Sequence, residues 1–360
     1  MRAMVLQRVG TIATNARPLV ASDVPVPRPS AGQLLIRVSA CGVCHTELDE
    51  IEGRLATAVP RIPGHQVVGH VEQVGPSTDE AWIGARVGVA WIYRACGRCQ
   101  ACRTGRENLC PDFVATGCDV DGGYAEYMIA FADFVYRIPP AFSDVNAAPL
   151  LCAGAIGYRS LQLANLQDGQ PLGLTGFGAS AHLVITMARA QYPRSRVYVF
   201  ARSSRDREFA RTLGAVWAGA TEERAPEPLA AIIDTTPAWK PVVEALDNLA
   251  PGGRLVINAI RKEAGDQDEL QRLDYAIHLW REKEIKTVAN VTRDDVRACL
   301  DLAAAIPIAP EVETYPLEAA NEALVDLKAG RLRGAKVLLP TRTPGSGTRR
   351  VQGEADFSAR

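Results

Sequence analysis

The feature that most constrains the fold is a regular alternation of short apolar segments with helical segments between residues 171 and 291. Apolar runs bounded by turn residues predict strands, and the periodic segments between them predict helices. The predicted strands are Pro171–Thr175, Arg196–Phe200, Ala230–Asp234, Arg254–Asn258 and Glu284–Val291, and the predicted helices are Ala181–Ala190, Glu208–Leu213 and Pro241–Leu249. Repeated βαβ units form a parallel sheet with covering helices. We therefore expect a doubly wound α/β domain over residues 156–291.

A glycine-rich turn joins the first predicted strand to the first predicted helix, with Gly176, Gly178 and Ala181 in a G-x-G-x-x-A pattern. The first glycine allows a tight turn, the second lets the backbone approach a pyrophosphate, and the small third residue packs the helix on the strand. The free N–H groups at a helix N-terminus bind phosphate. The pattern indicates a Rossmann-type dinucleotide site, with Ala179 and Ser180 as further cofactor-binding residues.

The turn after the second predicted strand bears on which dinucleotide binds. Chains that bind NAD usually carry Asp or Glu at this strand end to hold the ribose 2′-hydroxyl. This chain has Ala201 there, followed by Arg202, Ser203 and Arg205, which suit a 2′-phosphate. We predict that NADP(H) is preferred over NAD(H). The alternative is a solvated basic turn.

The regions on either side of residues 156–291 have a different pattern. Residues 1 to about 155 contain Val- and Ile-rich runs separated by Gly and Pro, which predict a mainly β domain. The runs are Leu34–Val38, Val67–Val74 and Arg86–Ala90, and the later predicted elements are helices over Asp294–Ala305 and Leu317–Leu327 and a strand over Ala335–Leu339. Residues 343–360 show no apolar period, so we expect a disordered tail.

Four of the nine cysteines fall in one short segment, as Cys96, Cys99, Cys102 and Cys110. Zinc in a structural role takes four tetrahedral ligands, and thiolates are common among them. Two successive C-x-x-C steps let a tight loop fold around one ion, Gly97 gives the turn its freedom, and the returning chain supplies the fourth ligand. We predict a structural zinc site. Ordinary reduced cysteines and an iron–sulfur cluster are the alternatives.

A second group of potential metal ligands is dispersed along the chain. The segment CGVCHTELD contains Cys41, Cys44 and His45, and His65 and Cys152 follow in PGHQVVGH and LLCAG. A catalytic zinc site keeps one coordination position open, so three protein ligands are enough. Two thiolates and one imidazole would form such a site.

Residues 1–340 resemble the zinc-dependent medium-chain dehydrogenases, and among them the bacterial alcohol dehydrogenases. The motifs that carry the resemblance are CGVCHTELD, PGHQVVGHVEQVG, CGRCQACRTGRENLC, DGGYAEY and LLCAG, in the family's order and spacing. The resemblance implies a GroES-like catalytic domain over residues 1–155 with both zinc sites, a Rossmann domain over 156–291, and a return to the catalytic domain over 292–342. It also implies that Cys44, not Cys41, binds the catalytic zinc together with His65 and Cys152.

The same resemblance implies roles for residues around the catalytic zinc. Thr46 would hold the substrate hydroxyl and begin proton release, and Glu47 would orient His65 from outside the ligand set. His45 would contact the cofactor pyrophosphate, and Trp91 would wall the substrate pocket.

Three positions depart from the family pattern. Gln66 stands where Glu is usual, and a neutral amide would approach the zinc less well during ligand exchange. Asp49 stands where many relatives have the histidine that ends the proton relay, so its carboxylate would accept the proton passed on by Thr46 and the cofactor ribose. Ile156 stands where the best-known members have a Thr near the nicotinamide.

The implied activity is the reversible oxidation of an alcohol to an aldehyde or ketone, with zinc as Lewis acid and NAD(P) as hydride acceptor. The alternatives are an aldehyde reductase, a polyol or formaldehyde dehydrogenase of the same fold, and a zinc-stabilised binding protein without the chemistry. A net charge of −1 gives no reason to expect nucleic acid or a membrane as partner. No segment resembles a membrane span or a signal peptide, so we expect a cytoplasmic protein. Family resemblance implies a homodimer or homotetramer.

Overall fold

The computed structural model describes residues 1–12, 17–306, 308, 310–330, 334–340 and 350–351. The chain divides into two compact units, with boundaries between Cys152 and Ala153 and between Val291 and Thr292. Unit 2 is the continuous segment Ala153–Val291, and unit 1 contains the described residues on either side of it. One unit is therefore inserted into the sequence of the other.

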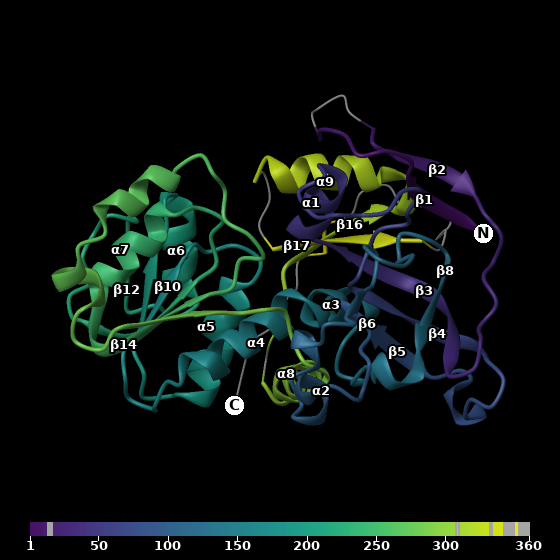
Figure 1. Ribbon diagram of the computed structural model, residues 1–360, viewed down its shortest axis with the longest axis horizontal. Coiled ribbons are helices and arrows are strands. Elements are labelled where there is room, and N and C mark those ends of the chain that lie inside the picture. Colours follow the sequence, from purple (N-terminus) through teal and green to yellow (C-terminus); the bar gives the residue numbers. More distant parts are fainter. Residues whose placement is uncertain (13–16, 307, 309, 331–333, 341–349, 352–360) are drawn as a thin grey trace, which may run out of the picture. The chain divides into compact units, whose positions relative to one another are not determined.

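Unit 2 is built on a parallel sheet, of which β10, β12 and β14 are labelled in Figure 1. The strand order is β12-β11-β10-β13-β14-β15. Its strands are β10 (Leu172–Thr175), β11 (Val197–Phe200), β12 (Trp217–Gly219), β13 (Leu229–Asp234), β14 (Leu249–Ile257) and β15 (Glu284–Thr287). Its helices are α4 (Ala153–Ala164), α5 (Ala181–Gln191), α6 (Ser204–Thr212) and α7 (Lys240–Asn248), with a 3-10 segment at Gln267–Arg272 and a π-helical segment at Tyr275–Leu279. The predicted doubly wound sheet is confirmed.

Both faces of this sheet are covered near its centre. Neighbouring residues of a strand point to opposite faces, and in β13 both Ile232 and Ile233 are fully buried. Ile232 belongs to a cluster that contains Leu246 of α7 and Leu255 of β14. Burial on both faces explains why the central strands read as continuous apolar runs.

Unit 1 is mainly β. Its main sheet has the order β18-β16-β17-β3-β4-β5-β9, and β8 also pairs with β3. The strands of this sheet are β3 (Gln33–Val43), β4 (Val67–Val74), β5 (Arg86–Val89), β8 (Tyr127–Phe131), β9 (Val135–Arg137), β16 (Val312–Pro316), β17 (Ala335–Leu339) and β18 (Arg350–Val351). Two antiparallel pairs complete the unit's strands: β1 (Arg2–Leu6) with β2 (Leu19–Asp23), and β6 (Ile92–Arg94) with β7 (Val114–Ala115).

The helices of unit 1 are short before residue 153 and longer after residue 291. They are α1 (His45–Ile51), α2 (Gln100–Arg103), α3 (Asp144–Ala147), α8 (Arg293–Ala305) and α9 (Ala320–Lys328), with 3-10 turns at Glu80–Trp82, Glu107–Leu109, Ala132–Phe134, Ala148–Leu151 and Leu317–Ala319. Among the described residues, no helix is long and apolar enough to cross a membrane.

Several predicted boundaries are wrong: β14 begins at Leu249 instead of Arg254, and β3 continues to Val43 instead of ending at Val38. The helix expected over Glu208–Leu213 begins earlier, at Ser204, because the Ser203 hydroxyl accepts a hydrogen bond from the Asp206 amide and caps it. The strand expected over Glu284–Val291 ends at Thr287. Most of the predicted disordered tail, residues 343–360, lies outside the described residues, apart from β18, which pairs with β16.

Candidate metal centres and cofactor turn

Three segments of unit 1 bring Cys44, His65 and Cys152 together. Cys44 directly precedes α1, His65 lies two residues before β4, and Cys152 follows the 3-10 turn Ala148–Leu151. The Sγ atoms of Cys44 and Cys152 are 3.9 Å apart, and His65 Nε2 is 3.3 Å from Cys152 Sγ. All three ligand atoms lie within 4.8 Å of one another.

This spacing fits a zinc ion. Zinc lies about 2.3 Å from thiolate sulfur and about 2.0–2.1 Å from imidazole nitrogen, so tetrahedral ligands are separated by about 3.8 Å (sulfur to sulfur) and about 3.5 Å (sulfur to nitrogen). The measured separations are close to both values. Two thiolates and one imidazole supply three corners of a tetrahedron, which leaves one corner for an exchangeable ligand.

Glu47 holds the histidine from behind. Its Oε1 lies 2.6 Å from His65 Nδ1, and its Oε2 accepts a hydrogen bond of 2.7 Å from the Cys44 amide. The Glu47 side chain is fully buried and that of His65 nearly so. Burial alone would lower the pKa of His65, but Glu47 and Cys44 raise it well above its usual value. The contact at Nδ1 directs Nε2 toward the two sulfur atoms.

The Cys44 sulfur is poised to carry negative charge. A hydrogen bond from Cys152 lowers the pKa of the Cys44 thiol well below its usual range, and His65 lowers it further, against the effect of burial. Thiolates rather than thiols bind metals, so this environment favours the ligand form of Cys44.

The other residues predicted near this centre take distinct positions. The Thr46 Oγ1 is 3.6 Å from Cys44 Sγ, and the His65 and Trp91 rings meet edge to face with centroids 4.9 Å apart. Gln66 is buried and packs against the backbone at Gly42. His45 is exposed, and Ile156 is half-buried on α4 in unit 2.

Asp49 is held by a basic partner that the sequence reading missed. Its Oδ1 accepts a hydrogen bond of 2.6 Å from Arg54 Nε, and the carboxyl is nearly buried. Arg54 also pairs with Glu52, which in turn contacts Lys328 of α9 at 2.5 Å. The carboxylate expected to end the proton relay is therefore one end of a charged chain that ties α1 to α9.

Glu50 is a buried acid that the sequence analysis did not identify. It is fully buried on α1, and neither carboxyl oxygen has a hydrogen-bond partner among the described residues. Burial, and next the charge of Glu47, raises the pKa of Glu50 well above its usual value. In the sequence it sits in a charged run that reads as a solvated helix face, so no local signal marks it.

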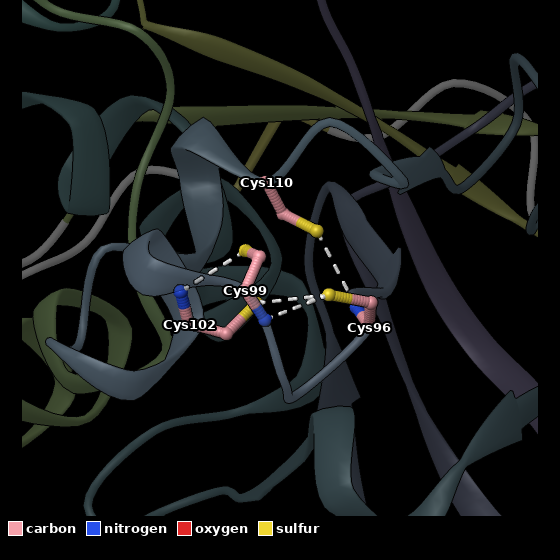
Figure 2. Close-up of side chains that lie close together, drawn as sticks. All are labelled: Cys96, Cys99, Cys102 and Cys110. Carbon is pink, nitrogen blue, oxygen red and sulfur yellow. Dashed lines mark hydrogen bonds between the residues drawn. The ribbon is translucent and has the colours of Figure 1, made fainter.

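The four-cysteine segment closes on itself within unit 1. The sulfur atoms of Cys96, Cys99, Cys102 and Cys110 point toward a common centre (Figure 2), and all lie within 4.8 Å of one another. Cys96 and Cys102 Sγ are 3.9 Å apart, again close to the edge of a zinc tetrahedron. With four thiols around one point, this ligand set leaves no corner for substrate.

Backbone amides stabilise the charge on these sulfurs. The amides of Cys99, Cys102 and Cys96 donate to the sulfurs of Cys96, Cys99 and Cys110 over 3.3–3.4 Å. The amides of Arg98 and Cys99 lower the pKa of the Cys96 thiol to about 6. Gly97 has φ +70°, a conformation that favours glycine, so it allows the tight turn between the first two cysteines.

The glycine turn of unit 2 has the conformation expected for a dinucleotide site. Gly176 has φ +75°, and a Cβ at Gly178 would meet nothing within 4 Å, so the backbone is accessible there. Ser180 donates its hydroxyl to the Ala153 carbonyl and caps no amide of α5. Within the described residues, the amides of Gly178, Ala179 and Ser180 donate no hydrogen bond. Free amides at the start of α5 fit a pyrophosphate group.

The turn after β11 exposes its basic side chains. Arg202, Ser203 and Arg205 are all exposed, and neither arginine pairs with another described residue. The Ser203 hydroxyl accepts from the Asp206 amide and so caps α6. Arg207 donates to the carbonyls of Ala201 and Arg202 at 2.8 and 2.9 Å, which fixes the backbone of the turn.

Comparison with known proteins shows the family to which the chain belongs. Residues 30–140 match the alcohol dehydrogenase GroES-like domain family. The chain is 44% identical over 345 residues to the probable alcohol dehydrogenase AdhA of Mycobacterium tuberculosis (94% of this chain, 97% of the relative). It is 33% identical over 334 residues to an alcohol dehydrogenase of Geobacillus stearothermophilus (88% and 94%). The solved cinnamyl alcohol dehydrogenase SbCAD4 of Sorghum bicolor superposes with a TM-score of 0.81 at 26% identity (94% and 96%).

The chain belongs to the zinc-dependent medium-chain alcohol dehydrogenase family. It is an NAD(P)-linked oxidoreductase that acts on alcohols, with zinc as its metal. Its substrates are small-molecule alcohols or aldehydes.

The contact between Glu47 and His65 leads to a first prediction. Replacing Glu47 with Gln removes the charge behind the imidazole, so zinc affinity is expected to fall by about 10–100-fold. Competition with a chromogenic chelator measures this affinity. Glu72→Gln is the control, because Glu72 pairs with Arg37 at the exposed surface of the same unit. Equal zinc affinity in Glu47→Gln and the parent would show that the contact does not support the ligand.

Proposed function

We propose that each chain binds two zinc ions with different tasks. Cys44, His65 and Cys152 would hold the catalytic ion. Cys96, Cys99, Cys102 and Cys110 would hold a structural ion. The observation that carries the proposal is the contrast between a set of three ligand atoms and a closed set of four, each with zinc-like spacing.

The residues beside the three-ligand set suggest how the substrate is handled. Zinc, when bound, stabilises negative charge on the alcohol oxygen, and the nicotinamide accepts hydride from the adjacent carbon. Thr46, whose Oγ1 lies 3.6 Å from Cys44 Sγ, would accept the hydroxyl proton of the substrate while releasing its own proton toward the cofactor ribose. Asp49 receives the proton further along and is kept in place by Arg54. Trp91, edge-on to His65, forms a wall of the substrate pocket.

The glycine turn of unit 2 would bind the cofactor. Gly176, Gly178, Ala179, Ser180 and Ala181 would receive the pyrophosphate, supported by the free amides of this turn. His45 would add a contact to the phosphates, and its exposed side chain is compatible with that role.

Removal of one ligand from each set tests the two-zinc proposal. Elemental analysis should give two zinc ions per parent chain and one in both Cys44→Ser and Cys99→Ser. Cys44→Ser should lose activity and keep most of its thermal stability. Cys99→Ser should unfold at a lower temperature, because a closed zinc site contributes folding free energy directly. Near-normal turnover in Cys44→Ser, or one zinc ion in the parent, would falsify the assignment.

We also propose that NADP(H) is preferred over NAD(H). The support is the exposed pair Arg202 and Arg205, neither paired with a described residue, in a turn that lacks the acid expected for NAD. An arginine that bonds a 2′-phosphate contributes about 1.5–3 kcal/mol. This corresponds to about tenfold discrimination or more. Ser203 would contribute less than its position in the sequence suggests, because its hydroxyl oxygen already caps α6.

The cofactor preference is tested by kcat/KM for one good alcohol with each cofactor. The parent should favour NADP, and Arg202→Ala should lose about tenfold of that preference. Arg194→Ala is a matched control, because Arg194 is an exposed arginine of unit 2 that pairs with Asp168. A parent that favours NAD, or an Arg202→Ala variant with unchanged preference, contradicts the proposal.

We propose that the chain forms a homodimer or homotetramer through unit 2. Strand β15 is an edge of the parallel sheet, and all four of its residues are exposed, including Ile285. Tyr275 and Trp280 precede it and are 65% and 56% exposed. An uncovered edge strand beside exposed aromatic rings is rare in a monomer. A second copy of the chain would cover both.

A charge in this strand should prevent association. Ile285→Lys is expected to shift the protein toward the monomer, measured by light scattering after size-exclusion chromatography. Val216→Lys, on the other side of the sheet beside β12, is the control, because Val216 is similarly exposed at 57%. If Ile285→Lys and the parent have the same mass, the interface lies elsewhere.

We propose that the protein works in a reducing compartment such as the cytoplasm. Its support is that all nine cysteines are free thiols and that six of them belong to the two proposed zinc sites. Thiolate ligands persist where disulfides do not form.

A further inference from the structure

A buried ion pair lies in unit 2, outside the glycine turn and the basic turn. The Asp234 side chain is fully buried at the end of β13, and Lys262 is 9% exposed in the segment after β14. Lys262 Nζ donates to Asp234 Oδ2 and also to the carbonyls of Thr236 and Ala238, at 2.8 and 2.9 Å. An ammonium has three protons, so all three are used.

The acid is equally well satisfied. Asp234 Oδ1 accepts hydrogen bonds from Thr175 Oγ1 at 2.6 Å and from Thr236 Oγ1 at 2.8 Å. The Thr236 amide adds a third bond to the same oxygen at 3.2 Å. A buried ion pair contributes little net stability compared with apolar packing, so its value lies in holding one geometry. Here the ion pair and its hydrogen bonds join the carboxyl ends of β10 and β13 to the segment that follows β14.

These segments lie where a parallel sheet binds its ligand. Strand β10 comes first in the chain, and its neighbours are β11 on one side and β13 on the other, so the strand order reverses at β10 and β13. Ligands of open α/β sheets bind outside the carboxyl ends of the strands at this switch point. Thr175 and Asp234 are the last residues of the two strands and lie opposite each other in register.

The clamp contacts the glycine turn through two threonines. A Cβ placed on Gly176 would lie 2.8 Å from both Thr235 Oγ1 and Thr236 Cγ2, so these side chains close one side of the turn. Further along, the Glu263 amide donates to the Pro237 carbonyl, and Asp266 accepts from the amides of Trp239 and Lys240 at the start of α7. Residues 262–266 are thus bonded along residues 236–240.

We propose that Asp234 and Lys262 are positioning residues for the dinucleotide. The pair fixes the segments after β13 and β14 against Gly176, so that one wall of the cofactor site is formed before the cofactor arrives. The inference rests on the NAD(P)-linked activity and concerns the wall on the β13 side of the turn. Arg202 follows β11, on the other side of β10, so the proposed 2′-phosphate contact is separate from it.

The zinc-loaded full-length chain allows a direct test. Titration calorimetry gives Kd for NADPH and for NADH in Lys262→Met and in the double variant Asp234→Asn/Lys262→Met, which leaves no unpaired charge. Both cofactors are expected to bind about tenfold more weakly, with an unchanged ratio of the two Kd values. KM for the cofactor should rise with Kd, while kcat at saturating cofactor changes little.

Two further variants separate positioning from folding. Thr236→Val removes one hydrogen bond to Asp234 without unpairing a charge, and it should weaken both cofactors in the same direction by a smaller factor. Arg196→Met breaks an exposed ion pair with Glu227. Arg196 precedes β11 and Glu227 precedes β13, so this pair lies at the amino-terminal ends of the strands, opposite the cofactor turn. The variant should therefore leave Kd unchanged. Unchanged Kd values in the double variant and in Thr236→Val, with only a lower melting temperature, would overturn the proposal. A loss confined to one cofactor would overturn it as well.

Discussion

The antiparallel pairing of β3 with β4 positions Cys44 and His65, two of the three ligands in the proposed catalytic zinc site. Cys41 lies opposite Val67 in this ladder, and the Gly42 amide donates to the Gln66 carbonyl at 2.9 Å. The end of β3 therefore meets the beginning of β4, and Cys44 and His65 lie just beyond the last paired residues. If the pairing register of β3 and β4 shifted by one residue, every side chain of the shifted strand would turn to the other face of the sheet. Register in this sheet thus determines the ligand geometry.

The negatively charged groups around Cys44, His65 and Cys152 explain why a bound cation would stabilise this part of unit 1. In their metal-binding form Cys44 and Cys152 place two negative charges close to the buried Glu47 carboxylate, and Glu50 adds another buried carboxyl on the same helix. Such groups repel one another unless a cation or protons compensate them. A dication at the three ligand atoms would compensate this charge, and metal binding would then be coupled to ordering of this part of the unit.

The sequence predicted what depends on short segments and motifs, and missed what depends on tertiary contacts. The four-cysteine loop and the glycine turn are local, so spacing and residue type identify them. Cys44, His65 and Cys152 could be grouped only by family resemblance, and the structure brings them together. Asp49 with Arg54 and Asp234 with Lys262 were missed. Arg54 lies in a loop that reads as solvated, and Asp234 and Lys262 are joined by a fold that no periodicity encodes.

The predicted start of α6 and the predicted end of β15 were wrong for a related reason. The start of α6 depends on the Ser203 cap, and the end of β15 depends on where pairing with β14 stops at Ile257 and Thr287. Neither limit is set by the apolar pattern alone, because caps and strand partners end elements that propensity would continue.

The insertion of unit 2 has a consequence for synthesis on the ribosome. Strand β17 pairs with β3, so the unit that begins the chain lacks this partner until residues 335–339 have been made. Unit 2 is continuous and ends at Val291, so its sheet can form while that edge of β3 is still open. An open edge is a template for pairing with another chain. The nascent chain therefore keeps the Cys41–Val43 end of β3 as an open edge until β17 has been made, although β4 and β8 can already pair with the rest of this strand.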